Sequence, residues 1–131
     1  MLAEIITQGL DLMSFSVPQE WDECMLVHLE DGAMSIIFKD GVVSIVQGEQ
    51  AEAESVVKLT NRQVCDAIDG STDIMLVWRQ LAEPSPTDKS TVLKGSGAKL
   101  TTVIECLTRC YTSKAEFKKI VDEFKSQLPD T

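Results

Sequence analysis

Histidine occurs only once in this sequence of 131 residues, as His28. A catalytic triad, or a metal site built on two histidines, therefore has no second imidazole to use. Long apolar runs are also missing, since none approaches the ~20 residues of a membrane-spanning helix. Segment 1–13 contains Glu4 and Asp11 but no lysine or arginine, so it does not resemble a signal peptide. We expect a cytoplasmic protein without stable membrane insertion.

Basic residues are few. The 12 lysines and arginines stand against 21 aspartates and glutamates, which gives a formal net charge of -9. This charge repels phosphate backbones and anionic lipid headgroups at long range. The sequence therefore predicts no nucleic-acid partner.

Two Asp-Gly pairs, Asp31-Gly32 and Asp40-Gly41, lie between segments of alternating hydrophobicity. Asp-Gly is typical of two-residue type I′ turns, because both turn positions need a positive φ. The predicted result is an antiparallel meander with strands at residues 23–30, 33–39 and 42–47. In this register Met25 lies opposite Phe38, and Phe38 lies opposite Val43. One face of the meander is then apolar, with Met25, Val27, Leu29, Met34, Ile36, Phe38, Val43 and Ile45.

The remaining periodicity predicts helices packed on this apolar face. Helices are expected at residues 2–13, 61–69, 98–111 and 113–128 and from residue 73, with further strands at 55–60 and 91–94. Gly9 weakens the first helix, and Ser113 and Glu116 form a capping box for the last one. A chain of this length forms one core. We predict a single domain, 1–131, with an α+β fold: a five-stranded, mostly antiparallel sheet with helices packed on one face.

Candidate catalytic and metal sites are weak. The segment Gly95-Ser96-Gly97-Ala98-Lys99 joins a strand to a helix and could hold an anion, but it lacks the spacing of a P-loop. Cys106 and Cys110 are one helical turn apart, yet unpaired cysteines are usually small core residues. The cysteines, at 24, 65, 106 and 110, follow no disulfide spacing, so reduced thiols are expected. We predict no metal, no cofactor and no catalytic residue.

The predicted meander is followed by Glu52-Ala53-Glu54-Ser55-Val56-Val57-Lys58-Leu59-Thr60, which leads into the helix at 61–69. Gly70, a second short helix and the strand Val92-Leu93-Lys94 come next, before an apolar helix. In this order of elements, segment 25–111 resembles the sterol carrier protein type-2 family of non-specific lipid transfer proteins. The proline-bearing loop at 82–90 and the turn at 95–98 depart from the usual pattern of that family.

The resemblance implies a non-catalytic protein that holds an apolar ligand, a fatty acyl, sterol or phospholipid chain, in a tunnel between sheet and helices. The side chains expected to line the tunnel are Met25, Ile36, Phe38, Trp78, Leu100, Val103, Ile104 and Leu107. The alternative is a protein-interaction or accessory module of the same fold with a solid core and no ligand. The sequence also leaves open whether the protein forms a homodimer through its long C-terminal helix.

Overall fold

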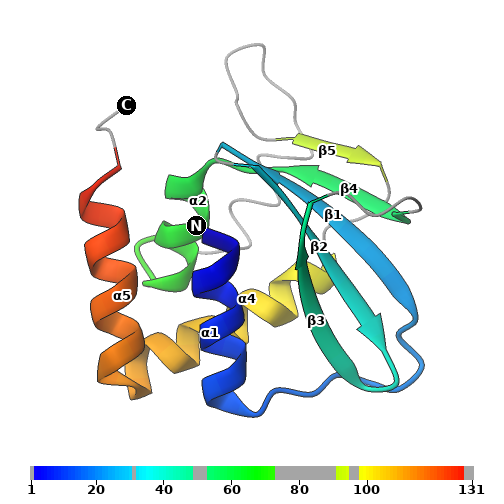
Figure 1. Ribbon diagram of the computed structural model, residues 1–131, viewed down its shortest axis with the longest axis horizontal. Helices are drawn as coiled ribbons and strands as arrows, with labels where there is room; N and C mark the ends of the chain where they lie inside the picture. Colours follow the sequence, from blue (N-terminus) through cyan, green and yellow to red (C-terminus); the bar gives the residue numbers. More distant parts are fainter. Residues whose placement is uncertain (1, 31, 49–52, 73–90, 95–97, 129–131) are drawn as a thin grey trace.

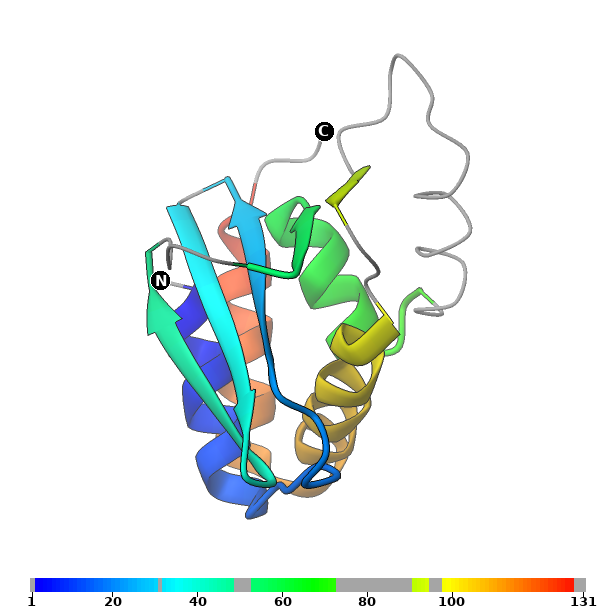
Figure 2. The ribbon, with the colours of Figure 1, turned by 90° about the vertical axis from the view of Figure 1, so that its right-hand side faces the viewer.

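The computed structural model describes residues 2–30, 32–48, 53–72, 91–94 and 98–128. A sheet forms one side of the molecule and the helices lie across one of its faces (Figures 1 and 2). The strands are β1 (Glu23–Leu29), β2 (Gly32–Lys39), β3 (Val42–Gln47), β4 (Ser55–Lys58) and β5 (Thr91–Lys94). Their order in the sheet is β3-β2-β1-β4-β5. The helices are α1 (Leu2–Met13), α2 (Asn61–Ile68), α4 (Ala98–Ser113) and α5 (Ala115–Ser126).

The sheet is mostly antiparallel, as predicted. β2 pairs antiparallel with both β1 and β3, and β4 pairs antiparallel with β5. Only the β1–β4 pair is parallel among the described strands. The apolar face of the meander is confirmed, because Met25, Ile36 and Phe38 are each 0% exposed. The predicted α+β architecture is therefore confirmed.

The register of the first hairpin differs from the prediction by two residues. Leu29 pairs with Gly32, and Met25 lies opposite Ile36 instead of Phe38. A shift of two residues leaves every side chain on its own face, so hydrophobic alternation does not distinguish the two registers. A tertiary contact favours the observed one: the Asn61 N–H donates to Glu30 Oε1 at 2.9 Å.

The second hairpin has the predicted register. Lys39 pairs with Val42, and Phe38 pairs with Val43. The turn residues Asp40 and Gly41 have φ values of 55° and 80°, both in the left-handed region that a type I′ turn requires. The turn also anchors the preceding loop, because the Val17 N–H donates to the Gly41 carbonyl at 3.0 Å.

Gly41→Val should therefore destabilise the protein. A β-branched residue is strained at φ 80°, and its Cβ would lie 3.3 Å from the Val17 carbonyl oxygen. We expect the free energy of unfolding, measured by urea denaturation, to fall by about 1–3 kcal/mol. Gly41→Asn is the control, because asparagine tolerates positive φ and should cost less. Equal stability of wild type and Gly41→Val would contradict the turn assignment.

Three helices pack around helix α4. α4 contacts α1, α2 and α5, and α5 lies on the side away from the sheet (Figure 1). Gly9 is buried at the contact between α1, α4 and α5, where an added Cβ would come within 2.6 Å of Leu107 and 2.7 Å of the Phe117 ring. Gly9 therefore permits a close approach of three helices. Its low helix propensity predicted a weaker first helix but did not predict this contact.

A side chain caps the N-terminus of α2, whereas the cap predicted for α5 does not form. Thr60 caps α2 in a full capping box with Gln63. By contrast, the residue before α5 is Lys114, which makes no side-chain capping hydrogen bond. Ser113 belongs to α4, and its hydroxyl donates to the Arg109 carbonyl at 2.7 Å. The predicted Ser113–Glu116 box is wrong because a serine at a helix C-terminus can instead bond the preceding turn.

Several predicted features lie outside the described residues. They are the helix from residue 73, which includes Trp78, the loop at 82–90 and the glycine turn at 95–97.

Candidate functional site

A small cavity lies between the sheet and the helices. It has a volume of about 10 Å³, which is about the space needed for one water molecule. All the described residues around it are apolar: Ile6, Val27, Met34, Ile36, Leu59, Val64, Leu100, Val103, Ile104 and Leu107. A cavity of this composition offers a water molecule no hydrogen-bond partner, so it is suited to hydrocarbon.

The structure brings five of the predicted site residues to this cavity. Ile36 reaches it from β2, and Leu100, Val103, Ile104 and Leu107 reach it from α4. Met25 and Phe38 are fully buried in the same hydrophobic core but do not line the cavity. Trp78 lies outside the described residues.

Sequence reasoning missed the other half of the lining. Val27 and Met34 share the apolar sheet face with Ile36, so the alternation that identified that face could have included them. Leu59, Val64 and Ile6 come from other elements. Their periodicity marks them as core residues, but which core residues meet at a cavity is decided by packing.

An aromatic side chain covers the core at the start of β1. Trp21 packs edge-on against Phe38, with ring centroids 5.6 Å apart and planes at 83°. Lys99, in the first turn of α4, places its Nζ 5.1 Å from the centroid of the Trp21 ring and forms an ion pair with Glu23. The Lys99 ammonium thus joins α4 to the sheet, an arrangement that disfavours the phosphate-binding alternative.

Three of the four cysteines have the environment of core residues. Cys65, Cys106 and Cys110 are buried, and each cysteine is a free thiol. Burial raises the pKa of the Cys65 thiol to about 12, and it also raises the pKa values of Cys106 and Cys110. A protonated thiol is a poor nucleophile and a poor metal ligand. Among the described residues, no group of three or more His, Cys, Asp or Glu side chains could hold a metal ion.

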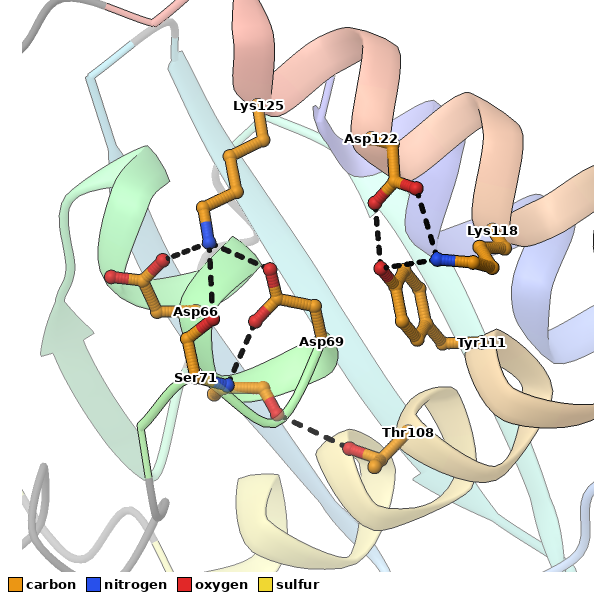
Figure 3. Close-up of polar contacts among 9 residues, drawn as sticks. Asp66, Asp69, Ser71, Thr108, Tyr111, Lys118, Asp122 and Lys125 are labelled. Atoms are coloured by element: carbon orange, nitrogen blue, oxygen red, sulfur yellow. Dashed lines mark hydrogen bonds and ion pairs between the residues drawn. The ribbon is translucent and has the colours of Figure 1, made fainter.

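Polar side chains join α5 to α2 beside the core (Figure 3). Lys125 Nζ lies 2.6 Å from Asp66 Oδ1 and 2.6 Å from Asp69 Oδ2, and it donates to Ser71 Oγ at 3.3 Å. Burial alone would raise the pKa of Asp69, but hydrogen bonds from Lys125 and Ser71 outweigh it and lower that pKa. Burial alone would lower the pKa of Lys125, but its bonds to Asp66 and Asp69 raise it.

Lys125→Met should weaken this junction while keeping the length of the side chain. The two aspartates would then face each other without a cation, and we expect a loss of about 1–2 kcal/mol in the free energy of unfolding at neutral pH. The pKa of Asp69 is lowered from its usual value of 3.8. The stability that the ionised Asp69 contributes is therefore complete above pH 3.8 and is lost as the pH falls below this value. The difference between variant and wild type should therefore shrink in acid.

Lys118→Met is the matched control for Lys125→Met. Lys118 lies on the same helix and pairs with Asp122 at 3.2 Å, but its side chain is 54% exposed. Exposed ion pairs contribute little, so this variant should lose much less stability. Equal losses for the two variants in urea denaturation would show that the α2–α5 junction has no special importance.

Comparison with known proteins identifies the fold but gives no match in sequence. No family model and no curated protein sequence matches the chain. A solved structure named UbiJ-SCP2 ubiquinone synthesis protein matches with a TM-score of 0.55, covering 86% of this chain and 93% of its own. The chain has a sterol carrier protein 2 (SCP2) fold. At 11% identity, the match supports the SCP2 fold alone, and no residue role is transferred.

Two further structures were matched with lower TM-scores. A crystal structure of sterol carrier protein 2 has a TM-score of 0.48 at 15% identity, covering 81% of this chain and 92% of its own. A conserved hypothetical protein from Thermus thermophilus, named as a suspected sterol carrier protein, has a TM-score of 0.45 at 13% identity, with coverages of 83% and 78%. The assignment of the SCP2 fold therefore depends on the first match.

No helix in the described part of the chain is both long and apolar enough to cross a bilayer.

Proposed function

We propose that this chain is a cytoplasmic, non-catalytic carrier that holds an apolar ligand, such as a fatty acyl, sterol or phospholipid chain, between its sheet and helices. The observation that supports this function is the cavity whose described lining is entirely apolar and comes from both layers. The SCP2 fold is compatible with lipid binding. The raised pKa of the buried Cys65 thiol keeps it protonated, as expected for a packing residue. Free cysteines suit a reducing compartment.

Ligand entry requires the cavity to expand. Sites for small molecules typically occupy ~300–1,000 Å³, whereas this cavity measures about 10 Å³. The helices would have to move away from the sheet, and flexible Met34 in the lining helps such repacking. Burying ~300 Å² of acyl surface at about 25 cal/mol/Å² gives roughly 7.5 kcal/mol. A micromolar dissociation constant corresponds to about -8 kcal/mol. Because expanding the cavity costs free energy, we expect the ligand to bind with micromolar or weaker affinity.

A second candidate follows from the small size of the cavity. An accessory or protein-interaction module of the same fold would keep its core closed and bind no ligand. The apolar side chains would then serve only to hold sheet and helices together.

Lipid analysis and a binding titration separate the two candidates. We expect organic extracts of the purified protein to contain lipid by mass spectrometry, and a fluorescent fatty-acid analogue to bind saturably near micromolar concentration. Binding should depend weakly on salt, because the hydrophobic effect drives it and the acidic surface does not attract headgroups. Extracts free of lipid, together with no saturable binding, would favour the accessory module.

A further inference from the structure

A buried side-chain oxygen at the start of α2 has no hydrogen-bond partner. Asn61 is 6% exposed, yet its Oδ1 receives no hydrogen bond from any described residue. An unsatisfied buried acceptor is unfavourable, and most such groups in proteins are paired. Asn61 Oδ1 is therefore a position at which a donor from a bound molecule would be stabilised.

Asn61 lies on the face of α2 that meets the apolar core. Val64 and Cys65 follow three and four residues later, which places them on the same helix face, and both are buried. Val64 lines the cavity, and so does Leu59, just before the helix. Asn61 itself is not part of the described lining, so a ligand would reach its oxygen only when the cavity expands toward the start of α2.

The group of Asn61 without a partner is the Oδ1 acceptor, so the missing partner is a donor. Glu30 Oε1 accepts the Asn61 N–H at 2.9 Å. Gln63 Oε1 accepts the Thr60 N–H at 2.9 Å, and Thr60 Oγ1 accepts the Gln63 N–H at 3.1 Å. A ligand carboxylate beside Asn61 would place an acceptor against an acceptor and a negative charge near Glu30. A hydroxyl group supplies the donor without the charge.

We propose that Asn61 Oδ1 accepts a hydrogen bond from an uncharged hydroxyl group of the ligand. The ligand is then an alcohol-bearing lipid, and a free fatty acid is the poorer ligand. This inference rests on the proposed carrier function and narrows its ligand class.

Three ligands with the same hydrocarbon chain test the inference: hexadecanol, methyl hexadecanoate and hexadecanoic acid. Each is used to displace the fluorescent fatty-acid analogue from the intact protein at neutral pH. Hexadecanol should bind roughly two- to tenfold more tightly than the ester, the range of one net hydrogen bond. In Asn61→Leu, which replaces the amide with a hydrocarbon of similar size, this preference should disappear while ester binding is retained.

Two controls separate the possible failures. Thr60→Ala removes the cap of α2 without touching the Asn61 amide, so it should affect the three ligands alike. Thermal unfolding should show that Asn61→Leu is folded, because it deletes an unsatisfied buried acceptor. An unchanged ranking in Asn61→Leu, or a preference for the acid in the wild type, would overturn the Asn61 inference and leave the carrier function standing. If neither the fluorescent analogue nor any of the three ligands binds, both the Asn61 inference and the proposed carrier function are wrong.

Discussion

Ile36→Trp is expected to lower the free energy of unfolding by about 3 kcal/mol. Ile36 is 0% exposed, and the cavity beside it measures about 10 Å³. An indole ring is much larger than this space together with the isoleucine side chain, so neighbouring side chains would be forced out of their preferred rotamers. Urea denaturation measures the loss, and titration with the fluorescent analogue should show that ligand binding is lost as well.

Ile37→Trp is the matched control for Ile36→Trp. Ile37 is the next residue of β2 and lies on the opposite, partly exposed face of the sheet. The same change there should cost no more than about 1 kcal/mol and leave ligand binding intact. If Ile36→Trp keeps wild-type stability but loses the ligand, the core contains more free space than the structure indicates, and a preformed tunnel is the better description.

Gly9→Val should also destabilise the protein by about 3 kcal/mol. The Cβ atom alone would come within 2.6 Å of Leu107 and 2.7 Å of Phe117, and both side chains are 0% exposed. Because neither side chain has open space to move into, α1 must shift away from α4 and α5. Thermal and urea denaturation measure the loss of stability.

Gln8→Val separates this packing effect from helix propensity. Gln8 is exposed on the same helix, so valine there changes propensity but meets no buried neighbour. Its cost should stay below about 1 kcal/mol. Comparable losses at the two positions would show that the close approach at Gly9 is unimportant.

Much of the candidate site was predictable because its residues obey local patterns. Ile36 lies on an alternating strand, and Leu100, Val103, Ile104 and Leu107 recur at helical spacing, so each was identified as facing the core. Asn61 was not predicted as a site residue. Its signal, a buried oxygen without a partner, arises only when α2 packs against the rest of the chain.

The sequence by itself determined the order of the described elements, their apolar faces and the second hairpin, because side-chain periodicity and positive-φ turn residues act over a few neighbouring positions. The tertiary structure decided the register of the first hairpin, since Glu30 contacts Asn61 from another element. It also gave Gly9 its role, which depends on Leu107 and Phe117 far along the chain. The size of the cavity was decided in the same way, because free volume depends on how side chains from the sheet and several helices fill one space together.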